Sequence, residues 1–96
     1  MEKQNERLNK ALENFRNEMF EIIKEELIKV GGRKEIHHEI ANDWDEDRYY
    51  LVTISAIFLQ EDELFVEAHC DLHDESYNEE LELYSCDDII SMIEKL

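Results

Sequence analysis

The feature that most constrains the fold is an apolar stripe with three- and four-residue spacing in the first third of the chain. Its members are Leu8, Ala11, Leu12, Phe15, Met19, Ile22, Ile23, Leu27 and Val30. Such spacing places apolar side chains on one face of an α-helix. Gly31-Gly32 follows directly, and glycine adopts the left-handed conformation that ends a helix at little steric cost. The sequence therefore predicts a helix of about 26 residues, roughly 39 Å long, that ends at the glycines.

The rest of the chain carries strand patterns. Residues 36–40 alternate between apolar and polar side chains, which predicts a short first strand. Residues 49–60 are rich in β-branched and aromatic side chains and give the strongest strand signal in the sequence. Alternation across residues 64–72 predicts a third strand, and we place a fourth at residues 80–84, after a polar loop at 74–79.

A short helix is expected at the end of the chain. Ser85 and Asp88, three residues apart, resemble a capping box at a helix start. The apolar stripe that follows is Ile89, Met92, Ile93 and Leu96. Short connections between successive strands favour an antiparallel meander with both helices on one face. We therefore expect a single two-layer α+β domain over residues 1–96, in the order α-β-β-β-β-α: a long N-terminal helix, a four-stranded antiparallel sheet and a short C-terminal helix.

Acidic residues outnumber basic ones, and they are unevenly distributed. The chain has 26 acidic and 10 basic residues and a formal net charge of -16. Residues 1–30 hold seven acids and six bases, whereas residues 31–96 hold nineteen acids and four bases. A surface with such an excess of one sign repels nucleic acid and anionic membranes and attracts basic partners. We therefore expect a basic protein partner or a second copy of the chain, with no direct binding to nucleic acid or membrane.

Nothing in the sequence predicts export. The first residues lack the apolar segment of a signal peptide, and no apolar run approaches the roughly 20 residues of a membrane-spanning helix. We expect a cytoplasmic protein in which Cys70 and Cys86 remain reduced thiols.

Two acidic segments are the candidate partner-binding surface. They are Asp43, Trp44, Asp45, Glu46 and Asp47 in a predicted loop and Glu61, Asp62 and Glu63 in the next predicted turn. Trp44 is either an interface anchor among carboxylates or a cap on the open end of the core, and the sequence favours neither. The function that these residues favour is a non-catalytic protein-binding module. It could be an inhibitor that mimics nucleic acid, an immunity protein that neutralises a basic toxin, or a small chaperone. The alternative is a self-assembling homodimer whose acidity only provides solubility.

One cluster has the chemistry of a metal site. On a strand, His69, Asp71 and His73 would project to one face about 7 Å apart, and His37 or His38 could complete a zinc or nickel site. The alternative is that these are polar residues on the solvent face of an amphipathic strand. Because no paired-cysteine motif accompanies them, we favour this alternative and expect neither a metal nor another cofactor.

No arrangement of residues predicts catalysis. The sequence has no glycine-rich phosphate loop and no serine elbow. Cys70 follows His69, but the alternation of the third predicted strand turns it inward with Val66 and Ala68, where a cysteine acts as a small apolar residue. We expect a protein that is not an enzyme.

The strongest predicted strand has an apolar face that nothing in the chain is expected to cover. Strict alternation turns Tyr49, Leu51, Ile57 and Leu59 away from the helices, with Phe65 of the next strand beside them. The solvent face of an antiparallel strand is normally polar, so this patch indicates an interface. The simplest partner is a second copy related by a two-fold axis. We expect a homodimer through this face, unless the two helices lie on opposite faces of the sheet.

Overall fold

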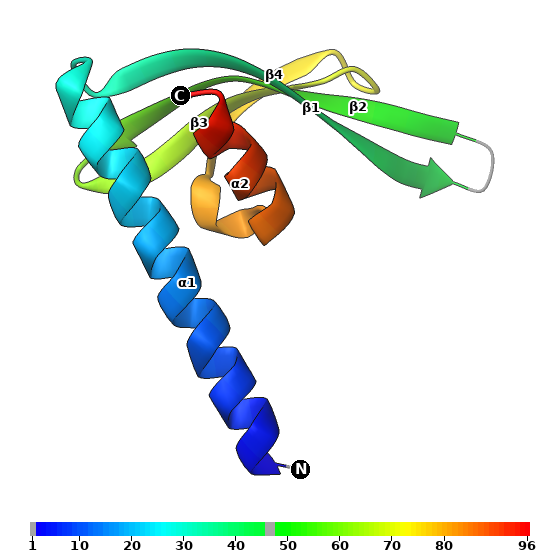
Figure 1. The fold of residues 1–96 in the computed structure, drawn as a ribbon. Helices are drawn as coiled ribbons and strands as arrows, with labels where there is room; N and C mark the ends of the chain where they lie inside the picture. Colours follow the sequence, from blue (N-terminus) through cyan, green and yellow to red (C-terminus); the bar gives the residue numbers. More distant parts are fainter. Residues whose placement is uncertain (1, 46–47) are drawn as a thin grey trace.

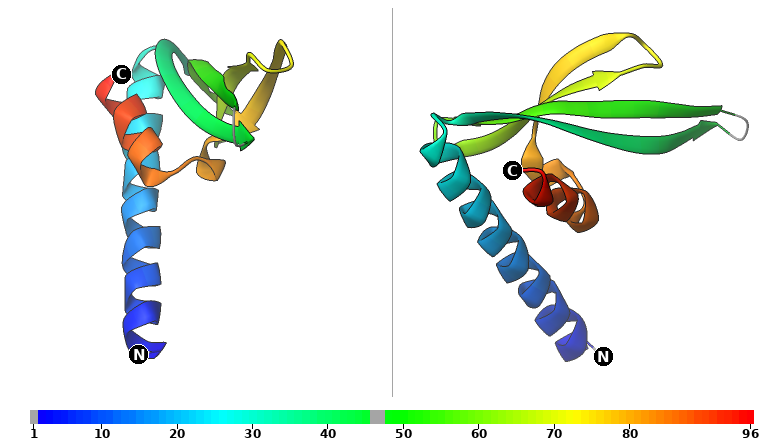
Figure 2. Two further views of the ribbon diagram at one scale, coloured as in Figure 1. Left: turned by 90° about the vertical axis from the view of Figure 1, so that its right-hand side faces the viewer. Right: turned by 45° about the horizontal axis from the view of Figure 1, so that its top comes forward.

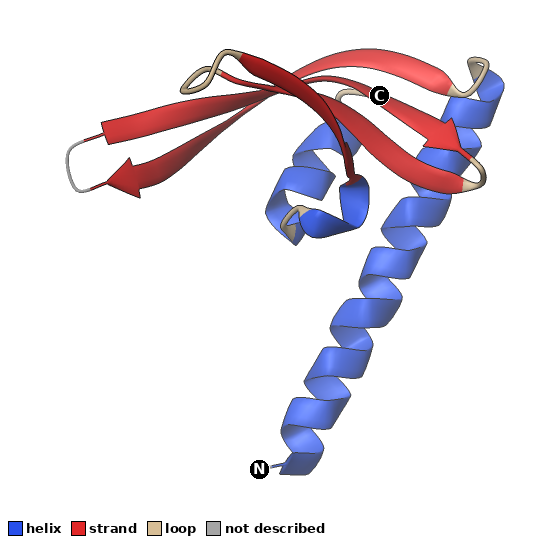
Figure 3. Cartoon of the chain, turned by 180° about the vertical axis from the view of Figure 1, so that it is seen from behind, coloured by secondary structure: helices blue, strands red, loops and turns tan. Residues whose placement is uncertain are grey.

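In the part of the chain that the structure describes, one antiparallel sheet and two α-helices make up the fold, with both helices on the same face of the sheet (Figures 1 and 3). The computed structural model describes the backbone of residues 2–45 and 48–96 and the side chains of residues 6–42 and 50–96. The elements are α1 (Glu2–Lys29), β1 (Arg33–Asp45), β2 (Arg48–Gln60), β3 (Glu63–Cys70), β4 (Glu75–Glu80), the 3₁₀ helix η1 (Leu81–Leu83) and α2 (Cys86–Glu94). The strands pair in sequence order, so the predicted α+β meander is confirmed. The alternative with helices on opposite faces is wrong.

The second half of α1 packs on the sheet, and the first half projects from it. The glycine pair ends the helix as predicted, with both residues at a φ of 91°. The amide of Gly32 donates a hydrogen bond to the carbonyl of Leu27 over 2.7 Å. Met19 and Ile23 are buried against the core, whereas residues 6–15 are all exposed. The N-terminal half of α1 extends well beyond the sheet and α2 (Figure 2).

β2 contains a bulge at Ser55 that the alternation pattern did not predict. Against β3, Ile54 pairs with Ala68 and Ala56 pairs with Glu67, so Ser55 is an extra residue between two neighbouring pairs. The register of β2 against β1 shifts at the same point. A bulge of one residue moves every later side chain of its strand to the opposite face.

The bulge reverses the faces of Ile57 and Leu59. Ile57 is fully buried, at 0% exposed, and Leu59 packs against the same core. The prediction that these two side chains point away from the helices is therefore wrong. Phe58, between them, turns to the outer face, and its ring stacks on that of Phe65 with centroids 5.8 Å apart.

The fourth strand lies earlier in the chain than predicted. β4 occupies residues that were expected to form a polar loop, and most of the predicted strand is η1. The amide of Tyr84 closes η1 by donating to the carbonyl of Leu81 over 3.1 Å. β4 is an edge strand, where polar side chains reach water and the apolar alternation is weak. β3 is also shorter than predicted, because residues 71–74 form a turn.

The core lies between the sheet and the helices. Its buried members are Met19, Ile23, Leu27, Val52, Ile54, Ile57, Leu64, Val66, Ala68, Cys70, Leu81, Ile89 and Met92. The inward orientation of Cys70 is confirmed, and both cysteines are free. Ser85 caps α2 as predicted, because its hydroxyl accepts a hydrogen bond from the amide of Asp88 over 3.2 Å.

Candidate functional site

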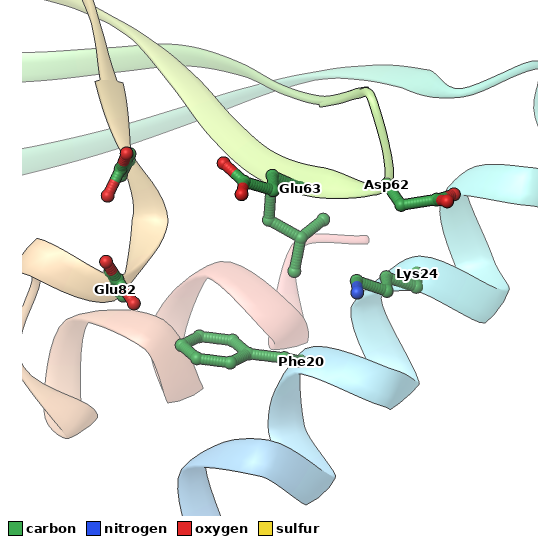
Figure 4. Close-up of a pocket in the computed structure, with 7 residues that line it drawn as sticks. Phe20, Lys24, Asp62, Glu63 and Glu82 are labelled. Carbon is green, nitrogen blue, oxygen red and sulfur yellow. The ribbon is translucent and has the colours of Figure 1, made fainter.

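A small cleft opens where α1 meets the end of the sheet. It lies between α1, the β2–β3 turn and the junction of β4 with η1, and it has a volume of about 240 Å³. We name it the acidic cleft. Its lining residues are Phe20, Lys24, Asp62, Glu63, Leu64, Glu80 and Glu82. In Figure 4 the ring of Phe20 lies across the cleft from Glu63, with Glu82 and Lys24 on either side. Three segments that are distant in sequence thus contribute to one surface.

The β2–β3 turn brings two carboxylates to the acidic cleft. Glu61 and Asp62 both have positive φ, at 53° and 66°, which is typical of a two-residue type I′ hairpin turn. Gln60 and Glu63 form the pair that closes the hairpin. Because this turn is short, Asp62 and Glu63 are held beside α1 rather than spread over a mobile loop.

Negative charge dominates the acidic cleft, with four carboxylates and one ammonium group, that of Lys24. A side-chain hydrogen bond to Glu82 raises the pKa of the Glu80 carboxyl, and repulsion from the charges of Glu82 and Glu63 raises it further. Two carboxyl groups that interact in this way favour the binding of a cation beside them, because its charge relieves their repulsion.

A second groove continues from the acidic cleft along α1. It has a volume of about 320 Å³ and shares Phe20 and Glu82 with the cleft. The guanidinium of Arg16 lies over the ring of Phe20, with its central carbon 5.7 Å from the ring centroid. Arg16 also donates a hydrogen bond to the backbone carbonyl of Glu82. The wall between the two grooves therefore already holds a cationic group by a cation–π contact and a hydrogen bond.

The predicted partner-binding residues divide into two groups. Asp62 and Glu63 line the acidic cleft, whereas Glu61 is exposed in the same turn and is not a lining residue. The side chains of Asp43, Trp44, Asp45, Glu46 and Asp47 lie outside the described residues. The backbone of residues 43–45 belongs to β1, so the predicted loop is at least partly strand.

Five residues of the acidic cleft were not among the predicted site residues: Phe20, Lys24, Leu64, Glu80 and Glu82. Phe20 and Lys24 are four positions apart on α1 and form a row of their own beside the apolar stripe. Phe20 is an aromatic residue outside the apolar stripe, and this was the one feature of the sequence that could have indicated the site. Nothing in the sequence pairs that row with the end of β4, because the contact depends on tertiary packing.

The metal candidates do not form a shared site. Asp71 and His73 lie in the turn after β3 and not on the strand. The ring of His69 contacts the hydroxyl of Ser76 at 2.9 Å and the carboxylate of Asp74 at 3.2 Å. Asp71 instead accepts a hydrogen bond from a backbone amide of β2 over 2.8 Å. Within the described side chains, no group of three or more His, Cys, Asp or Glu residues could hold a metal ion.

The outer face of the sheet keeps only part of the predicted self-association patch. Phe65 lies on this face, and Leu51 is exposed. Ile57 and Leu59 belong to the helix-covered face, and the side chain of Tyr49 lies outside the described residues. The patch is therefore smaller than the alternation pattern predicted.

Comparisons with protein-family models, curated proteins and solved structures give no match to this chain. In the described ranges 2–45 and 48–96, no helix is both long and apolar enough to cross a membrane. The geometry and charge of the acidic cleft are therefore the features from which a function can be inferred.

Proposed function

We propose that this protein is a non-catalytic binding module that recognises a basic protein through the acidic cleft, which receives a lysine or arginine side chain of the partner. The observation that carries the proposal is the convergence of four carboxylates around an aromatic and an aliphatic wall, Phe20 and Leu64. A basic side chain has the matching chemistry, because its aliphatic stem packs on apolar surface while its charged end meets carboxylates.

The size of the acidic cleft supports a side chain as its occupant. Pockets for small molecules typically have volumes of about 300–1,000 Å³. At about 240 Å³ the acidic cleft is below that range. This volume can receive a single side chain of a partner, and the second groove continues from it along α1.

The charge distribution supports a strongly basic partner. Residues 31–96 carry nineteen acids and four bases, so the field around the sheet is negative over a much larger area than the cleft. Such a field accelerates association with a basic protein and disfavours nucleic acid. Inhibitors that mimic nucleic acid, immunity proteins that neutralise basic toxins and small chaperones are the functional classes consistent with it.

Titration of a short oligo-arginine peptide tests the proposed function. The double variant Glu80→Gln/Glu82→Gln should bind about tenfold more weakly than the wild type, because two charge-assisted hydrogen bonds are lost. Glu75→Gln/Glu94→Gln is the matched control, since it removes the same charge at exposed positions outside the cleft. This control should bind within about twofold of the wild type, as expected for screened surface charges.

The same variants identify the natural partner. In affinity capture from the native lysate, a basic protein should bind the wild type and the control and be lost with the cleft variant, and added salt should weaken the complex. Equal peptide binding by all three proteins would reject the acidic cleft as the site. Measurable affinity for DNA or RNA would reject the charge argument as a whole.

A further inference from the structure

An apolar row on the projecting half of α1 is exposed. Leu8, Leu12 and Phe15 are 58%, 46% and 44% exposed, and Ile22 continues the row. These positions lie along one side of the helix because they are separated by steps of three, four or seven residues. The sheet and α2 end before this part of the helix (Figures 1 and 3). A continuous apolar row on a highly charged protein indicates an interface.

The spacing of this row is that of a coiled-coil seam. From Leu8, steps of four and three residues alternate through Leu12, Phe15, Met19 and Ile22. The mean of about 3.5 residues keeps one narrow side of a helix toward a partner helix. Met19 turns into the core of its own chain, and the residues before it do not. We name Leu8, Leu12 and Phe15 the α1 stripe.

The projecting half of α1 lacks the packing that normally stabilises a helix. None of the described side chains before Met19 is buried. Isolated helices shorter than about 12–15 residues are marginal in water, because most helical stability in proteins comes from packing of the apolar side. A partner helix along the α1 stripe would supply that packing.

Charge selects a second copy as the partner. Residues 1–30 have seven acids and six bases, so two copies of α1 can align without the repulsion that separates their acidic sheets. A strongly basic partner would be attracted to the sheet and the acidic cleft instead. The residues that flank the stripe, Asn9, Ala11, Arg16 and Glu18, include one charge of each sign. Two identical helices therefore meet without an excess of like charge.

We propose that two copies of this chain associate through the α1 stripe as an antiparallel helix pair, with the two-fold axis near Leu12. The antiparallel arrangement places the two acidic sheets at opposite ends of the pair, whereas a parallel one would bring them side by side. This interface is separate from the acidic cleft, which uses the row of Phe20 and Lys24 on another side of α1. The test of the α1 stripe can therefore fail while the test of the acidic cleft succeeds, and the reverse also holds.

Sedimentation equilibrium over a series from micromolar to millimolar protein tests the association. The wild type should dimerise reversibly, and Leu12→Lys should stay monomeric throughout the series. Ile28→Lys is the matched control, because Ile28 is on the same helix, is 69% exposed and lies outside the stripe. This control should dimerise like the wild type. Circular dichroism should show a folded Leu12→Lys protein with less helix, as the projecting half frays.

Cysteine cross-linking tests the orientation in a Cys86→Ser background. Leu12→Cys should form a disulfide-linked dimer near the two-fold axis, and Ile22→Cys should not, because an antiparallel pair separates the two copies of residue 22. A linked Ile22→Cys dimer would instead show a parallel pair and contradict the proposal. A monomeric wild type, or a dimer that persists in Leu12→Lys, would overturn it. So would a dimer that only Phe58→Lys dissociates, since that result assigns the interface to the outer face of the sheet.

Discussion

The imidazole of His38 on β1 lies 3.0 Å from the carboxylate of Asp88 in the first turn of α2, measured from Nε2 to Oδ1. On its other side, Nδ1 of the ring is 3.1 Å from the ammonium of Lys95 at the C-cap of the same helix. An ammonium group only donates, so Nδ1 accepts and Nε2 carries the proton that is donated to Asp88. His38 is 8% exposed, and it is the only polar residue that is buried among the described side chains. It connects the sheet to both ends of α2.

Replacement of His38 by alanine should lower the free energy of unfolding by about 2–4 kcal/mol, because it leaves a cavity and removes a partner from Asp88 and Lys95. The neighbouring His37 provides the control, since its ring is exposed. His37→Ala should change the free energy of unfolding by less than about 0.5 kcal/mol. Urea denaturation of both variants measures the difference. Equal stabilities would contradict the linking role of His38.

The pair of Glu80 and Glu82 should make stability depend on pH. Because the pKa of Glu80 is raised in the folded protein, its contribution to stability is fully present below the ordinary pKa of a glutamate. That contribution is lost as the pH rises through the raised value. Glu82→Gln should therefore increase the melting temperature near neutral pH and have little effect in acid. An increase of the same size at both pH values would exclude repulsion between the two carboxylates as its cause.

Arg33 and Glu67 form a two-point ion pair across the outer face of the sheet, with N–O distances of 2.6 and 2.8 Å. The hydrogen bond from Arg33 lowers the pKa of Glu67 and is the largest cause of the shift. The pair therefore stabilises the fold above the ordinary glutamate pKa, and this stability is lost as the pH falls through the lowered value. Glu67→Gln should lower the melting temperature slightly near neutral pH, and the difference should disappear in strong acid. A difference that persists there would point to packing rather than charge.

The bulge at Ser55 predicts opposite outcomes for two adjacent residues. Ile57→Lys should lower the free energy of unfolding by about 4 kcal/mol or more, because it places an ammonium group in the core. Phe58→Lys should cost less than about 2 kcal/mol, since its side chain is on the outer face and loses mainly the stack on Phe65. Chemical denaturation of both variants checks the order. The reverse order would show that β2 alternates without a bulge.

Features that depend on nearby residues could be read from the sequence. Gly31 and Gly32 end α1 because each has a φ that other residues adopt only with strain, whatever the rest of the chain does. Ser85 caps α2 through an amide only three residues away. The antiparallel meander could also be predicted from the sequence, because strands joined by short connections can pair only in the antiparallel direction.

Features that depend on distant partners could not be read in this way. Alternation within β2 predicted an outward Ile57, but in the pairing with β3 Ser55 is an extra residue, and this bulge reverses that face. β4 has a weak apolar pattern, and its pairing with β3 identifies it as a strand.

The candidate site shows the same division. The charge of Asp62 and Glu63 was evident from the sequence, and it predicted the sign of the surface to which they belong. The acidic cleft exists because packing of α1 on the sheet brings Phe20 beside that turn and beside Glu82. Likewise, the apolar spacing of residues 8–30 was evident from the sequence. Only the position of the sheet decided that Met19 is buried while Leu8 and Leu12 remain exposed. The sequence by itself determined which residues are apolar or charged and where helices and turns end. Contacts between distant segments determined which of those side chains reach solvent, because burial depends on what packs against each one.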